Sequence, residues 1–103
     1  MINQEFQNKK VLITGGSKGI GRSICIELAK KGAHVIFTYR KSDKTVKSLK
    51  NFSSKNNYHL YGYKVSNLKD KNIKNFFKKI KKKHKKINFL INNIGDAIQR
   101  SKF

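Results

Sequence analysis

Four short apolar runs recur along the chain and predict β-strands at residues 10–14, 34–39, 58–65 and 87–92. Each run is rich in β-branched or aromatic residues and is too short for a buried helix. The third run is the least regular, because Gly62 interrupts it and polar residues alternate through it. The fourth, INFLIN, is apolar at four of its six positions, as expected of a strand that is covered on both faces.

Three amphipathic stretches lie between these runs and predict helices at residues 20–31, 43–52 and 67–84. A glycine that follows a run of lysines ends the first stretch, which is typical of a helix C-terminus. Asn67 and Asp70 resemble a capping box at the start of the third. Apolar positions recur at helical spacing; they are Ile20, Ile24, Cys25 and Leu28 in the first stretch and Leu68, Ile73, Phe76, Phe77, Ile80 and His84 in the third.

The alternation of strands and helices predicts an α/β fold with a parallel sheet and right-handed crossovers. The chain has 103 residues, of which 37% are hydrophobic, so it is long enough for one domain and too short for two. We therefore expect a single domain over residues 1–103.

Several classes of protein are disfavoured by the composition. The single cysteine, Cys25, excludes an internal disulfide framework, and the three histidines have no metal-ligand spacing. No apolar stretch approaches the ~20 residues that cross a bilayer, and the N-terminus lacks the apolar core of a secretory signal. A soluble, cytoplasmic protein with no metal and no membrane partner is the expectation.

The charge is strongly unbalanced, with 25 Lys and Arg against 5 Asp and Glu, a formal net charge of +20. Such a balance is typical of proteins that bind nucleic acid or anionic surfaces. Asparagine, isoleucine and phenylalanine are also abundant, whereas proline and tryptophan are absent. This joint bias is what an A/T-rich genome would impose, so we interpret much of the charge as drift on exposed surface.

The turn between the first strand and the first helix contains the sequence TGGSKGIG, residues 14–21. A glycine-rich turn at this place brings backbone N–H groups and the positive end of a helix to one point, which suits a phosphate. Its position inside a strand-helix-strand unit is the context that favours dinucleotide binding. A glycine turn that holds no ligand is the alternative.

The T-G-x-x-x-G-x-G spacing of this turn resembles the coenzyme turn of the short-chain dehydrogenase/reductase family, especially members similar to bacterial 3-oxoacyl-acyl-carrier-protein reductases. A second mark, NNIG at residues 92–95, resembles the family's N-N-A-G and follows the fourth strand. The resemblance covers the chain from about residue 8 to its end. It implies a Rossmann-type three-layer α/β fold, here the N-terminal half only, with about four parallel strands and helices on both faces.

The resemblance also implies roles for individual residues. A pyrophosphate would be wrapped by five residues of the turn, which are Gly15, Ser17, Gly19, Ile20 and Gly21. Asn92, Asn93 and Gly95 would lie beside the ribose of the coenzyme. An alternative for Asn92 is structural, because in this family the motif also ties neighbouring strands together.

The end of the second strand distinguishes the two nicotinamide coenzymes, since an acidic residue there binds the ribose 2′-hydroxyl and a basic one favours the 2′-phosphate. Tyr39 stands at the expected acidic position, and Arg40 and Lys41 follow it. Lys18 in the glycine turn adds a further cation. We therefore expect NADP(H) rather than NAD(H).

Two positions depart from the family pattern. Lys64 stands where the family has an aspartate for the adenine amino group, so adenine contacts would rest on Val65 and backbone groups. Ile94 replaces a small alanine and adds bulk near the sugar.

The family's catalytic tyrosine, lysine, serine and asparagine all belong to the half that follows the fourth strand, and no Y-x-x-x-K occurs in this sequence. We therefore expect no catalytic residue here, a chain that is a truncated coenzyme-binding portion and inactive alone, and a carbonyl substrate only in an intact relative. The family's dimer helices would also be missing. The strand at 87–92 would then be a bare apolar edge, which predicts self-association.

Two rival functions remain. The lysine-covered stretch at residues 69–86 could bind polyanions. A solvated helix face explains the same lysines, and non-specific electrostatic binding of nucleic acid is expected from them in any case. The second rival is a non-functional remnant.

Overall fold

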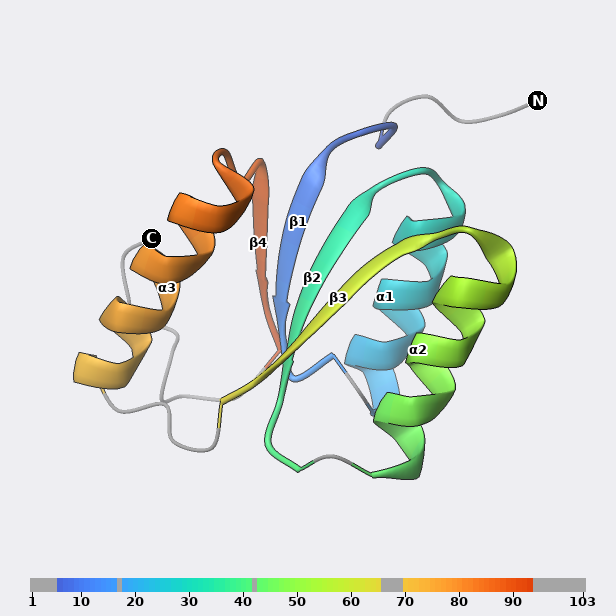
Figure 1. The fold of residues 1–103 in the computed structure, drawn as a ribbon, viewed down its shortest axis with the longest axis horizontal. Helices are drawn as coiled ribbons and strands as arrows, with labels where there is room; N and C mark the ends of the chain where they lie inside the picture. Colours follow the sequence, from blue (N-terminus) through green and yellow to red (C-terminus); the bar gives the residue numbers. More distant parts are fainter. Residues whose placement is uncertain (1–5, 17, 42, 66–69, 94–103) are drawn as a thin grey trace.

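The computed structural model describes residues 6–16, 18–41, 43–65 and 70–93 (Figure 1). Its strands are β1 (Lys10–Thr14), β2 (His34–Tyr39), β3 (His59–Lys64) and β4 (Phe89–Asn92). They form one four-stranded sheet in the order β3-β2-β1-β4. Every pairing is parallel; Leu12 of β1, for example, lies opposite Ile36 of β2 and Leu90 of β4. The predicted parallel α/β fold is confirmed.

Three helices cover the two faces of this sheet. Helices α1 (Gly19–Lys30) and α2 (Lys44–Asn56) lie on one face, and α3 (Asp70–His84) lies on the other (Figure 1). The chain runs outward from β1 through β2 to β3 and then crosses back to β4 on the far side of β1. This reversal makes the β1/β4 boundary the topological switch point, the place where doubly wound sheets bind ligands.

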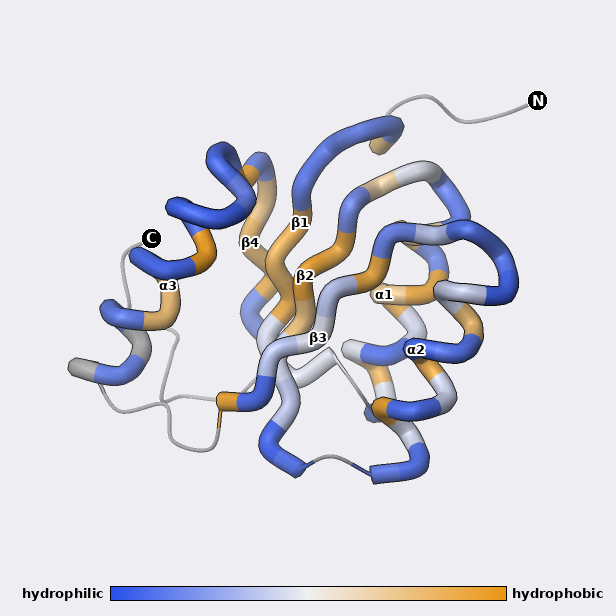
Figure 2. The backbone as a smooth tube through the Cα atoms, in the orientation of Figure 1, coloured by the Kyte–Doolittle hydropathy of each residue, from blue (hydrophilic) through white to orange (hydrophobic). Residues whose placement is uncertain are grey.

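The core has two parts, one on each face of the sheet. Nine buried residues join the sheet to α1 and α2; they are Val11, Ile13, Cys25, Leu28, Ala29, Ala33, Val35, Phe37 and Leu49. Leu12, Ile36, Phe77 and Ile80 form the second cluster under α3. Figure 2 shows the hydrophobic colour concentrated on the central strands, and most of α3 coloured as hydrophilic. β1 and β2 are therefore covered on both faces.

Some predicted boundaries were wrong. Helix α2 continues to Asn56, beyond the predicted end at residue 52. Its last residues, KN after two serines, carry no apolar periodicity, and the helix ends where Asn57 adopts the left-handed conformation at φ 58°. β3 and β4 are also shorter than predicted, at six and four residues.

Two burial expectations were also wrong. Ile20 was placed on the apolar face of the first helix, but it is 73% exposed, because it lies in the first turn of α1 at the end of the sheet. Phe89 is 47% exposed although its strand reads as covered on both faces. β4 is the outer strand of the described sheet, and α1 and α2 lie over the other strands (Figure 1). The predicted capping box lies outside what is described, since it involves Asn67 and the side chain of Asp70.

Candidate functional site

A cavity of about 430 Å³ opens at the carboxyl ends of the strands, beside the start of α1. Its lining comprises Gly15, Lys18, Thr38, Tyr39, Arg40, Lys41, Asp43 and Val65. The structure thus brings together five residues predicted for the site, which are Gly15, Lys18, Tyr39, Arg40 and Val65. Thr38 and Asp43 were not predicted.

The glycines of the turn are required for two different reasons. Gly15 and Gly19 adopt positive φ angles of 69° and 56°, which side chains disfavour. Gly16 has no room, because a Cβ there would lie 2.6 Å from the Cβ of Phe37. A Cβ on Gly21 would collide with the Gly15 carbonyl oxygen and lie 2.5 Å from the Asn93 amide nitrogen. Packing of the turn against the protein itself therefore accounts for Gly16 and Gly21.

Thr38 anchors the glycine turn to β2. The Gly15 N–H donates to the Thr38 hydroxyl at 2.9 Å, and the Gly16 N–H donates to the Thr38 carbonyl at 3.0 Å. Thr38 is 1% exposed, so these bonds hold the turn against a buried strand end. In the sequence Thr38 looks like any β-branched strand residue, and only the fold places it beside the turn.

The start of α1 faces this turn without a cap of its own. Its N-cap residue, Lys18, makes no side-chain cap hydrogen bond, and the first turn contains no acidic residue. The first N–H groups of a helix have no partner inside the helix, and its N-terminus carries a partial positive charge. This helix end is suited to an anion.

Asn92 and Asn93 tie β4 to β1 and to the turn. The Thr14 hydroxyl donates to the Asn92 side-chain oxygen at 3.1 Å, and the Asn93 N–H donates to the Thr14 hydroxyl at 3.0 Å. The Asn93 side-chain amide donates to the Gly15 carbonyl at 3.0 Å. The structural alternative weighed for Asn92 is therefore confirmed. Contact of these residues with a ribose stays a prediction, and the predicted Ser17 and Gly95 lie outside the described residues.

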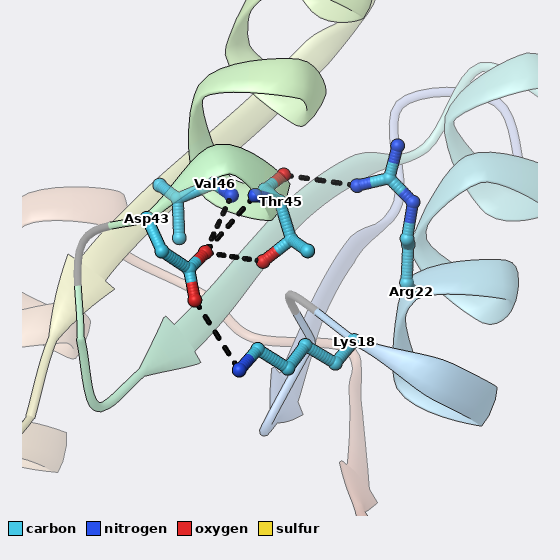
Figure 3. A network of polar contacts seen from close by, with 5 residues as sticks. All are labelled: Lys18, Arg22, Asp43, Thr45 and Val46. Atoms are coloured by element: carbon cyan, nitrogen blue, oxygen red, sulfur yellow. Dashed lines mark hydrogen bonds and ion pairs between the residues drawn. The ribbon is translucent and has the colours of Figure 1, made fainter.

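An ion pair between two lining residues of the cavity joins the glycine turn to the start of α2 (Figure 3). The Lys18 ammonium lies 3.2 Å from one carboxylate oxygen of Asp43. The other oxygen accepts hydrogen bonds from the Thr45 hydroxyl at 2.6 Å and from the Thr45 and Val46 N–H groups at 3.0 and 3.4 Å. Asp43 thus caps α2 and holds Lys18 at the same time.

These contacts lower the pKa of Asp43 from its ordinary value of 3.8 to about 2. The hydrogen bond from the Thr45 hydroxyl is the main cause, and Lys18 and the two backbone N–H groups add to it. Each of these groups stabilises the ionised carboxylate, so Asp43 is negatively charged at neutral pH.

Two further cations and an aromatic ring complete the cavity wall. Arg40 and Lys41 are exposed after β2, whereas Tyr39 is half-buried and packs against the core beneath α1 and α2. The Val65 N–H donates to the Tyr39 carbonyl at 2.9 Å, which fixes the end of β3 beside β2. The wall is therefore cationic, with the single carboxylate of Asp43 among its lining residues.

Other reactive groups in the described part of the chain do not form a second site. Burial raises the pKa of the Cys25 thiol to about 12, so it is protonated and unreactive. No group of three or more metal-binding side chains occurs among the described residues. None of the helices in this part of the chain is long and apolar enough to span a membrane.

The α3 lysines whose side chains the structure describes lie on its exposed side. Phe77 and Ile80 are buried against the sheet, and Lys78, Lys79 and Lys82 are exposed. This is the arrangement of a helix with one apolar stripe and a solvated remainder.

The fold and the placement of this cavity define a Rossmann-type α/β protein with its candidate site at the carboxyl ends of β1, β2 and β3. The family model for short chain dehydrogenases matches residues 9–102. The chain belongs to the short-chain dehydrogenase/reductase family.

Individual relatives agree with this assignment. The chain is 32% identical over 91 residues to an L-rhamnose 1-dehydrogenase (NADP(+)) from Thermoplasma acidophilum, covering 88% of this chain and 36% of the relative. It is 29% identical over 98 residues to a (+)-neomenthol dehydrogenase from Capsicum annuum, covering 92% of this chain and 31% of that protein. This chain therefore spans about a third of the length of these curated relatives.

Solved structures show the same fold. A short-chain dehydrogenase/reductase from Serratia marcescens superimposes with a TM-score of 0.78 at 25% identity, over 88% of this chain and 37% of that one. A Bacillus thuringiensis protein described as a 3-oxoacyl-reductase superimposes with a TM-score of 0.75 at 26% identity, over 92% and 39% of the two chains.

Proposed function

We propose that this chain is the coenzyme-binding portion of an NADP(H)-dependent oxidoreductase that transfers hydride between carbonyl and hydroxyl groups. The observation that carries the proposal is the cationic cavity at the carboxyl ends of β1, β2 and β3, with the start of α1 on one side and Arg40 and Lys41 on the other. The pyrophosphate of the coenzyme would lie at the glycine turn, and its 2′-phosphate would lie near the cations that follow β2.

The name of one relative supports the choice of NADP(H). The Thermoplasma acidophilum protein is named as an NADP(+) enzyme, and it matches this chain over most of its length. The residues of the cavity support it independently, because Tyr39 offers no carboxylate to a ribose 2′-hydroxyl and Arg40 offers a guanidinium to a phosphate.

When bound, NADP(H) supplies the hydride chemistry, and the residues of this chain bind and orient the coenzyme. Gly15 and Gly19 would allow the pyrophosphate to approach the backbone, and Asn93 holds the turn in place through Gly15. The sequence contains no Y-x-x-x-K to supply the general acid. We therefore assign this chain to coenzyme binding and none of its residues to catalysis.

The proposal is tested by titrating the chain with NADPH and NADH and following coenzyme fluorescence. We expect NADPH to bind more tightly than NADH. Replacing Arg40 with Ala should weaken NADPH binding about tenfold, equivalent to ~1.4 kcal/mol, and change NADH binding by less than about twofold. Lys55→Ala is the matched control, because Lys55 is an exposed cation in the last turn of α2. Absence of binding at millimolar NADPH would refute the proposal.

A further inference from the structure

We infer that Asp43 is a specificity-determining residue of this cavity, because its carboxylate competes with the 2′-phosphate of the coenzyme for Lys18. The inference rests on the proposed function and goes beyond it. It predicts that the chain binds 2′-phosphorylated nucleotides less tightly than its cations alone would allow.

The two oxygens of the Asp43 carboxylate have separate tasks (Figure 3). One accepts all three cap hydrogen bonds, which come from the Thr45 hydroxyl and from the N–H groups of Thr45 and Val46. The other faces the Lys18 ammonium at 3.2 Å. The cap fixes the position of the carboxylate, so Asp43 stays at the start of α2 whether or not Lys18 is paired with it.

Lys18 is the mobile partner of this pair. Its side chain is 69% exposed, whereas that of Asp43 is 34% exposed. A lysine ammonium is a point charge on a flexible stem and can follow a stronger anion. A phosphate dianion in the same cavity would attract Lys18 more strongly than one carboxylate does, and Asp43 would repel that dianion.

The residues around the pair place Asp43 and a bound phosphate close enough to compete for Lys18. Lys18, Arg40, Lys41 and Asp43 line one cavity, so any phosphate bound by these cations lies in the field of the carboxylate. Arg22 stands close by but is occupied elsewhere, since it donates to the Thr45 carbonyl at 2.9 Å and to the Ser48 hydroxyl at 2.8 Å. Arg22 therefore fastens α1 to the N-terminal part of α2, beside the pair, and is not free to replace Lys18.

The experiment compares adenosine 2′,5′-bisphosphate with adenosine 5′-monophosphate as ligands, using calorimetry on the full chain. Asp43→Asn keeps the cap, because Asn is an equally good N-cap residue, and replaces the oxygen that holds Lys18 with an uncharged amide nitrogen that cannot accept a hydrogen bond from it. We expect Asp43→Asn to tighten binding of the bisphosphate about three- to tenfold and to leave that of the monophosphate within about twofold.

Two further variants control for charge and for the partner. Glu27→Gln removes the same charge from an exposed carboxylate on α1, which lies 3.9 Å from Lys30 and does not line the cavity. It should shift binding of the bisphosphate much less than Asp43→Asn does. Lys18→Gln should weaken binding of the bisphosphate and reduce the effect of adding Asp43→Asn to the part that comes from direct repulsion by the carboxylate. Far-UV circular dichroism checks that each variant is folded.

The outcomes separate this inference from the proposed function. If both nucleotides bind but Asp43→Asn has the same effect as Glu27→Gln, or weakens binding of the bisphosphate, the inference is wrong and the proposed function stands. If neither nucleotide binds to any of these variants or to the unaltered chain, both are wrong. A ligand-free measurement checks the ion pair itself, since a carbon-13 titration should show a higher Asp43 pKa in Lys18→Gln than in the unaltered chain.

Discussion

At the scale of single residues, lack of space for a Cβ constrains the glycine turn as much as positive φ angles do. Gly16 sits against β2 and α1, where a Cβ would lie 2.6 Å from the Phe37 Cβ and 2.8 Å from the Cys25 sulfur. Both neighbours are fully buried, so neither can move aside easily. Gly19 has the opposite environment, because a Cβ there would meet no atom within 4 Å.

This contrast predicts different outcomes for two alanine substitutions. Gly16→Ala should lower the free energy of unfolding by about 1–3 kcal/mol, the usual cost of overpacking a core. Gly19→Ala should cost only the strain of its positive φ, about 1 kcal/mol, and should weaken NADPH binding because the new methyl group points into open space beside the start of α1. Urea denaturation and coenzyme titration of both variants provide the measurement. Equal losses of stability would contradict the steric explanation.

At the scale of elements, ring contacts link the three histidines of the chain, since His34 and His84 both pack against Tyr61 of β3. His34 and His59 stack with ring centroids 4.1 Å apart, at the beginnings of β2 and β3. His84, at the end of α3, shares a 2.8 Å hydrogen bond with the Tyr63 hydroxyl on β3. His34 and His59 occupy the end of the sheet opposite to the candidate site, because they begin their strands and the glycine turn follows the carboxyl end of β1.

The histidines predict a loss of stability in mild acid. The pKa of His34 is lowered by burial, then by His59 and Lys10. That of His84 is lowered by burial, then by Lys83, Lys10 and His34. The unfolded chain therefore binds protons more readily than the folded one, and the stability supplied by the neutral rings falls as the pH drops through their ordinary value of 6.5.

Thermal unfolding followed at several pH values between 7.5 and 5 tests this expectation. The melting temperature should fall across the window, and His84→Gln should reduce the fall. Asp43 does not contribute there, since its lowered pKa gives stability that is lost only as the pH falls below 3.8 toward about 2. A melting temperature that stays constant down to pH 5 would contradict the prediction.

The order and type of the elements could be predicted because apolar periodicity is a local property of the sequence. The end of α2 could not, because Ser53 and the residues after it carry no periodicity and the helix stops where Asn57 can adopt a left-handed conformation. In the candidate site, the glycines of the turn and the cations after β2 could be predicted, because they form motifs of consecutive residues. The pair between Lys18 and Asp43 joins residues on two different elements, so it depends on how α1 and α2 lie together.

At the scale of the whole molecule, the strong net charge and the apolar edge strand have opposite effects on association between copies of the chain. The net charge of +20 repels one copy from another. Within the described residues β4 pairs only with β1, and Phe89 on it is 47% exposed. An apolar cavity of about 370 Å³ beside this strand is lined by Phe6, Val11, Ile24, Leu28, Phe89, Leu90 and Ile91. An apolar edge strand of this kind favours pairing with another chain.

Salt decides which of these two effects prevails. Between about 0.01 M and about 1 M salt the Debye length falls from ~30 Å to ~3 Å, so repulsion between copies fades while apolar contact does not. We therefore expect the chain to be monomeric at low salt and to associate as salt is added, as measured by light scattering coupled to gel filtration. Phe89→Lys should suppress the association, because it places a charge on the edge strand itself. Ile20→Lys adds the same charge at a residue that is 73% exposed on α1, and it should leave the association largely unchanged. A monodisperse monomer at high salt, or equal suppression by the two variants, would show that β4 does not direct the association.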